Sequence, residues 1–161
     1  MSAACYRDRL ADEVAKSRAV LLETIDDATQ IIISEHSLPY DWDPPRKDGV
    51  VEYMRQTLSS DQRAELRRIV KDSGDSSKGP GVNLGLIEPH HAIIFRNKDK
   101  ELTLQVSFGA QVLDGGENSE IFNRPYSPDL VPALEAFFIK LGFKPRADWE
   151  KLASEIRNLE P

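Results

Sequence analysis

The chain contains one cysteine, three histidines and no long hydrophobic run, and each of these shortages excludes a class of protein. The single thiol, Cys5, cannot form an internal disulfide or a thiolate-rich metal centre. Apolar runs of only a few residues are too short to span a bilayer. Basic residues are also in the minority, because 21 Lys and Arg face 27 Asp and Glu, for a net charge of −6. A nucleic-acid binder needs a basic face, so this balance argues against that role.

The length of 161 residues, 40% of them hydrophobic, suits one domain of ordinary size. A chain of this size buries roughly 70% of its unfolded surface and needs no disulfide or metal to fold. Residues 1–5 show neither the basic start nor the apolar stretch of a secretory signal, so the cytoplasm is the expected location. The order Ser-Ala-Ala-Cys before residue 6 is similar to the end of a lipoprotein cleavage site. It leaves open a lipid-anchored periplasmic protein whose signal lies outside the chain.

Helical spacing of apolar residues predicts an N-terminal helix within residues 1–27 and two C-terminal helices within 127–158. A further helix is expected to begin at Ser59, because Gln62 three residues later completes a capping box. Gly142 is a natural end for the first of the two C-terminal helices.

Strands are expected between these helices, over residues 28–116. The best signal is a period of two in which Leu102, Leu104, Val106, Phe108, Ala110 and Val112 share one face. This pattern predicts one strand over 102–112, paired antiparallel with residues 92–95 across a polar turn at 96–100. The segments 29–35 and 50–57 also favour strands, and the Pro-rich segment 38–49 and the Gly- and Ser-rich segment 74–81 favour loops. The chain therefore predicts a single α+β domain over 1–161, with an antiparallel sheet of about four strands packed against amphipathic helices.

The residues Glu88-Pro89-His90-His91 are the first candidates for chemistry. In a strand Glu88 and His90 would share a face and could bind one metal, with His36 or a loop acid as third ligand, while His91 points the other way. This pattern allows a metal-dependent hydrolase. Adjacent histidines that open a strand also pack or form hydrogen bonds without binding anything. Since no activated nucleophile or phosphate loop is present, a protein without catalytic activity or cofactor is favoured.

Two acidic segments carry aromatic residues and suit a protein interface. We expect a partner with a basic surface to bind them, provided that they lie side by side. Ordinary solubility charge and aromatics packed on the protein's own core are the alternatives. The candidate contact residues are Tyr40, Asp41, Trp42 and Asp43 in the first segment, and Asp114, Glu117, Glu120 and Tyr126 in the second.

A resemblance rests on Leu58-Ser59-Ser60-Asp61-Gln62, on Glu88-Pro89-His90-His91-Ala92-Ile93-Ile94-Phe95, and on Val106-Ser107-Phe108. In this order the segments resemble a group of small uncharacterised bacterial α+β proteins with a Pro-His-His-Ala strand. Gly85, Ser107 and Ala110 stand where those proteins carry cysteines, so the resemblance implies the fold and no thiol or metal role for these positions.

An acidic domain without catalytic equipment is typical of a bacterial immunity protein, an inhibitor that covers the basic active site of a cognate toxin. The alternatives are the hydrolase that uses Glu88 and His90, and a structural subunit or adaptor of a larger assembly. The sequence leaves the partner's identity and the oligomeric state open.

Overall fold

The computed structural model describes residues 3–74, 88–122 and 125–159; the rest of the predicted loop at 74–81 and Gly85 lie outside these ranges. The described helices and strands follow one another along the chain as α1 (Ala3–Asp27), β1 (Gln30–His36), the 3-10 helix η1 (Pro39–Asp41), β2 (Glu52–Thr57), α2 (Ser60–Asp72), β3 (His91–Asn97), β4 (Lys100–Ser107), β5 (Val112–Asp114), the 3-10 helix η2 (Gly116–Asn118), α3 (Ser119–Phe122), α4 (Leu130–Lys140) and α5 (Trp149–Arg157).

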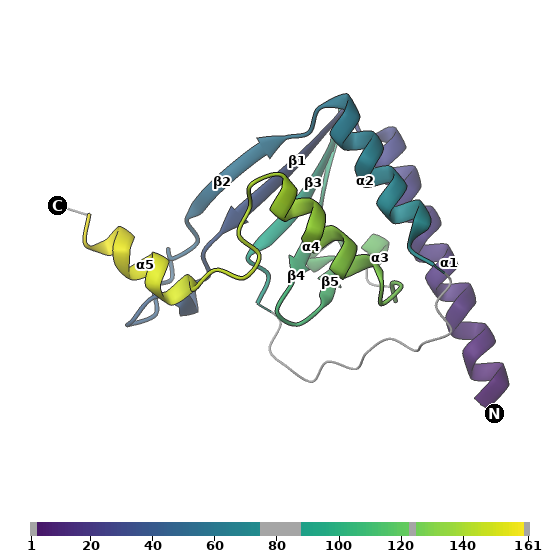
Figure 1. The fold of residues 1–161 in the computed structure, drawn as a ribbon, viewed down its shortest axis with the longest axis horizontal. Helices are drawn as coiled ribbons and strands as arrows, with labels where there is room; N and C mark the ends of the chain where they lie inside the picture. Colours follow the sequence, from purple (N-terminus) through teal and green to yellow (C-terminus); the bar gives the residue numbers. More distant parts are fainter. Residues whose placement is uncertain (1–2, 75–87, 123–124, 160–161) are drawn as a thin grey trace.

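The α+β class is confirmed, with five antiparallel strands where the sequence predicts about four. The strand order is β2-β1-β3-β4-β5, so β1 pairs with β2 on one side and with β3 on the other (Figure 1). The hairpin of β3 and β4 has the predicted antiparallel pairing, with Ile93 opposite Leu104 and Phe95 opposite Leu102.

The prediction of one continuous strand over 102–112 is wrong beyond Ser107. The chain turns at residues 108–111 and returns as β5, which pairs with β4 itself. Gln111 has a φ of 55°, a left-handed conformation that cannot continue a strand. The turn also shifts the apolar pattern by one residue, so Leu113 is buried and Val112 is only half-buried. Leu104, Val106 and Phe108 face the core as predicted.

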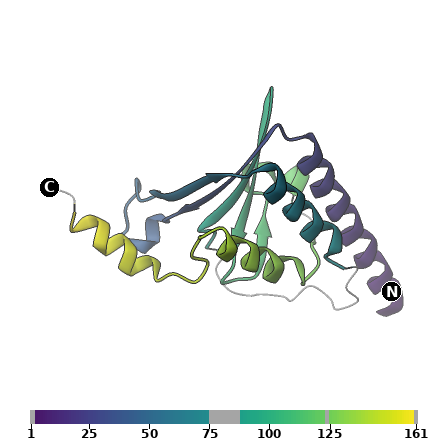
Figure 2. The same cartoon turned by 45° about the horizontal axis from the view of Figure 1, so that its top comes forward.

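The helices α1, α2 and α4 cover one face of the sheet and enclose the main core (Figures 1 and 2). The apolar side chains of α4 supply the aromatic centre of this core, through Phe137 and Phe138. Ile32, Ala92 and Ile94 form a small separate cluster on the opposite face of the strands. Ser59 and Gln62 form the predicted capping box of α2, and Gly142, with a φ of 94°, follows the end of α4. None of the described helices is long and apolar enough to cross a membrane.

One end of the molecule stands apart from this layered arrangement. Figure 2 shows α5 beyond one end of the sheet, together with the loop that follows β1, while α1 lies at the opposite end of the molecule. The 3-10 helix η1 in that loop contacts α5. This end holds all three histidines, because β1 ends where β3 begins.

Candidate binding site at the end of the sheet

The adjacent histidines His90 and His91 each bind a different buried carboxylate. The Nε2 atom of His90 lies 2.9 Å from Asp41 in η1, and the Nε2 atom of His91 lies 2.9 Å from Glu35 in β1. Glu35 and His91 are direct partners in the β1–β3 register. The four side chains are all at least nine-tenths buried, so each pair takes both of its members out of water.

The Glu35–His91 pair joins the sheet to the segment that leads into α5. Glu35 also accepts a 2.7 Å hydrogen bond from the backbone N–H of Lys144. Burial opposes ionisation of Glu35, but the hydrogen bonds from His91 and Lys144 outweigh it and hold the pKa of the carboxyl below its usual value. Burial lowers the pKa of His91, against the opposing effect of Glu35. The pair therefore consists of a carboxylate and a neutral imidazole near pH 7.

The ring of His91 is enclosed by aromatic edges and belongs to the core. Its centroid lies 5.1 Å from that of Phe108 and 5.5 Å from that of Trp149, both in edge-on geometry. His91 lines a pocket of about 310 Å³ with Glu88, His90 and Trp149, but its side chain is only 1% exposed and its Nε2 atom is bound to Glu35, so the ring presents little of its surface to that pocket. We interpret the Glu35–His91 pair as structural.

His90 contacts both η1, through Asp41, and α5, through Trp149. Its ring stacks on Trp149 at 4.2 Å and 7°, and its Nδ1 atom lies 3.2 Å from the backbone carbonyl of Glu88. Asp41, on the other side, also accepts a 2.7 Å hydrogen bond from the N–H of Leu38. Both ring nitrogens of His90 thus face oxygen atoms of the protein.

The structure places Glu88 and His90 close together, but it offers His90 no free nitrogen for a metal. The Glu88 residue is exposed, and the atom that it presents to His90 is its carbonyl oxygen. His36, the suggested third ligand, is half-buried at the end of β1, where burial and the neighbouring histidines lower its pKa. Among the described residues, no group of three His, Cys, Asp or Glu side chains has the arrangement of a metal site.

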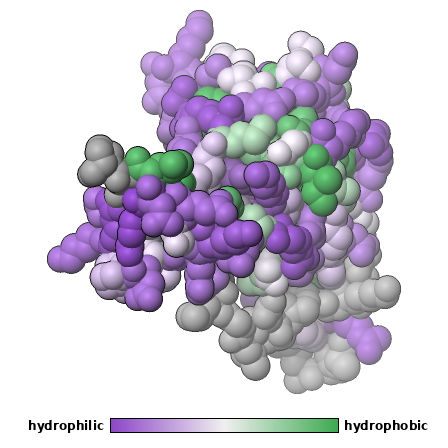
Figure 3. Space-filling view, turned by 60° about the vertical axis from the view of Figure 1, so that its left-hand side comes forward, coloured by the Kyte–Doolittle hydropathy of each residue, from purple (hydrophilic) through white to green (hydrophobic). Residues whose placement is uncertain are grey.

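A groove of about 710 Å³ lies between η1 with its following loop and α5. The candidate residues of the first acidic segment line this groove. Figure 3 shows this end of the molecule, where the surface is mostly hydrophilic. Tyr40 is 78% exposed and Asp43 is also exposed, so both can be reached by a partner. The groove is lined by Tyr40, Asp41, Trp42, Asp43, Pro45, Asp148, Glu150, Lys151, Ser154 and Arg157.

Trp42 is part of the scaffold of this groove. Only 2% of the residue is exposed, and its indole Nε1–H donates a 2.8 Å hydrogen bond to the carbonyl of Gly49. The guanidinium groups of Arg46 and Arg157 lie 4.7 and 5.8 Å from the ring centroid. Arg157 also donates to the carbonyl of Asp43, which fixes the end of α5 against the loop. The tryptophan therefore packs within the protein, and Tyr40 is the aromatic residue that the groove presents.

The second predicted segment lies elsewhere in the fold. Asp114 ends β5, and β3 and β4 separate β5 from β1, so the two acidic segments do not form one face (Figure 1). Glu117 and Glu120 are exposed at that other edge, in η2 and α3. Tyr126 is half-buried, packs against the core and donates to the carbonyl of Phe122.

The sequence interpretation missed the contribution of α5 to the groove. The helix itself is predicted from the spacing of Trp149 and Ala153, but nothing in that spacing shows that α5 folds back onto η1. Asp148, the N-cap of α5, and Glu150 in its first turn supply acidic groups that the second segment was expected to provide.

No protein-family model, curated protein or solved structure matches the chain, so the functional assignment depends on this geometry.

Proposed function

We propose that the protein is a non-catalytic binding module. Its groove between η1 and α5 binds basic side chains of a protein partner. The observation that carries the proposal is an acidic groove with one highly exposed tyrosine, Tyr40, beside it. The specific role that we propose is that of an immunity or inhibitor protein, which covers the basic active site of a toxin.

The charges of the groove favour a cationic partner. Three exposed acids, Asp43, Asp148 and Glu150, line it against two basic residues. Arg157 is engaged with the backbone of Asp43 and with the indole face. Within the part of the chain that the structure describes, the carboxylates of Asp43 and Glu150 form no ion pair or hydrogen bond. Such groups lose no existing partner when a Lys or Arg side chain arrives.

The buried histidine pairs make the groove rigid before binding. Asp41 and His90 hold η1 against the start of β3, and the stacked Trp149 holds the start of α5 on the same residue. A preformed site loses less conformational entropy on association than a mobile one. This arrangement gives the two histidines a function in support of the surface, in place of a catalytic one.

The aromatic residue and the acids are expected to act on different steps of binding. Tyr40→Ala should raise the dissociation rate about 30-fold, which corresponds to a hot spot of about 2 kcal/mol. Asp43→Lys with Glu150→Lys should mainly slow association at low salt, because steering charges act before contact. Glu117→Lys with Glu120→Lys makes the same change in net charge at the other edge and is the matched control.

The test uses the full-length chain as bait in extracts of the organism that encodes it, together with the product of the neighbouring gene, followed by binding kinetics across a salt series. The proposal requires that the groove variants weaken binding and that the control pair leaves it within about twofold. Equal effects of both charge-reversed pairs, or an association rate independent of salt, would contradict it. A partner with a large apolar interface would instead indicate a structural subunit.

Metal analysis separates this proposal from the hydrolase alternative. We expect no stoichiometric zinc or iron in protein purified without chelator and without a histidine tag, because His90 already faces two protein oxygens. If the protein carries about one metal ion per chain and the His90→Ala variant loses it, the metal-dependent hydrolase is favoured instead.

A further inference from the structure

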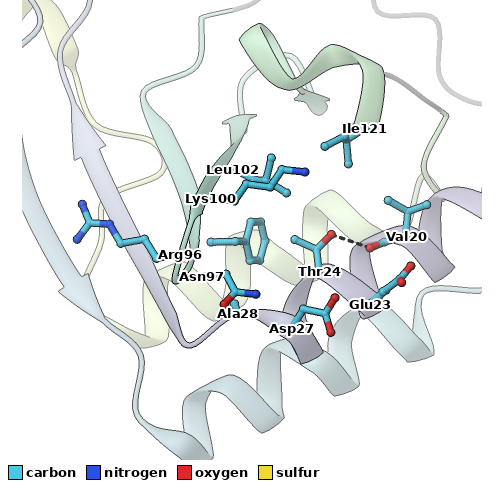
Figure 4. Close-up of a pocket in the computed structure, with 11 residues that line it drawn as sticks. Val20, Glu23, Thr24, Asp27, Ala28, Arg96, Asn97, Lys100, Leu102 and Ile121 are labelled. Atoms are coloured by element: carbon cyan, nitrogen blue, oxygen red, sulfur yellow. Dashed lines mark hydrogen bonds between the residues drawn. The ribbon is translucent and has the colours of Figure 1, made fainter.

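A second pocket lies between α1, the β3–β4 hairpin and α3, on the side of the sheet covered by helices (Figure 4). Its volume of about 270 Å³ suits a ligand with few atoms. The apolar part of the lining comes from all three elements. Val20 lies in α1 and Ala28 directly follows it, Phe95 and Leu102 lie in the hairpin, and Ile121 lies in α3.

Glu23 and Asp27 supply two carboxylates on the α1 side of this pocket. Neither carboxylate forms an ion pair or hydrogen bond with any described residue. They stand four residues apart at the end of a helix whose last turn contains no basic residue. Two negative charges at this spacing repel each other, and the negative end of the helix dipole disfavours both. A cation in the pocket would relieve both effects.

Three neighbouring arginines are occupied elsewhere and do not neutralise these acids. Arg67 binds Asp26, which lies beside Asp27 in the chain, and Arg63 donates to the last carbonyls of α1. Arg96 lines the pocket, but its guanidinium binds Glu101 at 2.6 Å.

Lys100 supplies a positive charge on the opposite side of the pocket. In Figure 4 its side chain points away from the strands of the hairpin, while the two carboxylates come from α1. Lys100 forms no ion pair with Glu23, Asp27 or any other described residue. The pocket thus has an apolar lining with anionic groups on one side and a cationic group on the other.

We propose that this pocket binds a free α-amino acid with an apolar side chain. The ligand's ammonium would lie between Glu23 and Asp27, its carboxylate would face Lys100, and its side chain would cover Phe95 and Leu102. An apolar amine would leave Lys100 without a counter-charge, and an apolar acid would be repelled by the two carboxylates. A neutral hydrocarbon would match none of the three charges. This site lies apart from the η1–α5 groove and does not depend on the function proposed for that groove.

The test is an NMR titration of the ¹⁵N-labelled chain with L-leucine and L-phenylalanine. Saturable shifts are expected at the amides of Thr24, Ala28 and Asn97, with a dissociation constant of about 1 mM or tighter for ligands of about ten non-hydrogen atoms. Phenethylamine and 3-phenylpropionate, which each lack one charge, should bind at least about fivefold more weakly.

Variants then assign the contacts. Glu23→Gln with Asp27→Asn should weaken amino-acid binding about tenfold, and Lys100→Met about fivefold. Val20→Phe, which fills the pocket from the helix surface, should abolish binding, and Asp12→Asn, an exposed acid elsewhere on α1, should leave it unchanged. Circular dichroism verifies that each variant is folded.

The proposal is overturned if neither amino acid produces saturable shifts up to about 20 mM, about twenty times the expected dissociation constant. It is also overturned if phenethylamine or 3-phenylpropionate binds as tightly as L-phenylalanine. Shifts that survive both the carboxylate double variant and Val20→Phe would place the ligand elsewhere and reject this site.

Discussion

Replacing Glu35 by alanine removes an acceptor that joins β1 to β3 and to the segment leading into α5. In the folded protein the carboxylate accepts from His91 Nε2 at 2.9 Å and from the Lys144 N–H at 2.7 Å. Because the pKa of His91 is lowered by burial, its imidazole is neutral near pH 7 and donates its Nε2 proton to the carboxylate. Glu35→Ala leaves both donors without an acceptor.

The size of the effect follows from the surroundings of the two donors. The His91 side chain is 1% exposed, so its lost hydrogen bond should cost toward the upper end of about 1–3 kcal/mol. The Lys144 amide belongs to an exposed residue that water can reach, so its loss should cost about 1 kcal/mol. We expect Glu35→Ala to lower the free energy of unfolding by about 3–4 kcal/mol. Glu35→Gln keeps one oxygen acceptor and should lose roughly half as much.

Urea unfolding at pH 7, followed by tryptophan fluorescence and far-UV circular dichroism, measures these differences. The ring of Trp149 lies 5.5 Å from that of His91, so its emission reports directly on this region. Glu101→Ala is the matched control, because Glu101 is half-exposed and pairs with Arg96 on the surface, where such a pair contributes about 1 kcal/mol or less. If Glu35→Ala costs no more than this control, the pair does not hold the segment to the sheet and our reasoning fails.

Three further predictions concern the core, pH and the loop. Phe108→Ala should cost about 3–5 kcal/mol in urea unfolding, because the side chain is 2% exposed. The unfolded chain takes up protons on its histidines near pH 6.5, while the lowered pKa values of His36 and His91 delay protonation in the fold. Stability should therefore fall as the pH drops below about 6.5, and a flat profile down to about pH 5 would contradict this assignment. Gly49→Ala would place a Cβ 2.5 Å from a tryptophan atom and should cost about 1–3 kcal/mol by calorimetry, whereas Gly109→Ala, with open space around it, should cost much less.

Local patterns in the sequence predicted α1, α2, α4, α5 and the β3–β4 hairpin, but not the short helix α3. The capping box of Ser59 and Gln62 and the alternation from Leu102 to Val106 involve residues that are neighbours in the chain, so their physics is readable without a fold. The end of β4 was not predictable in this way. The apolar alternation continues through Phe108 to Val112, although the chain turns at residues 108–111, where Gln111 has a left-handed backbone.

The candidate site was predictable only in part, because its contacts join residues far apart in the sequence. The exposed Tyr40 and Asp43 were identified because acidic and aromatic residues occur together in their segment. The internal position of Trp42 depends on a loop that folds back so that Gly49 accepts its indole N–H. The Asp41–His90 pair depends on how a loop closes over the end of a strand, which no local pattern encodes.

The position of β1 between β2 and β3 has a kinetic consequence. The hairpin of β3 and β4 is local and can form in about 1–10 μs. The pairing of β1 with β3 joins Ile33 to Ile93, whose numbers differ by 60, so a long loop must close before that contact is made. Domains that mix helices and strands fold at rates between those of helical bundles and all-β domains, and we expect the β1–β3 pairing to be the slow step here. Before β1 pairs with it, β3 is an apolar strand whose backbone N–H and C=O groups on that edge are unpaired. Refolding at high protein concentration should therefore favour aggregation through β3.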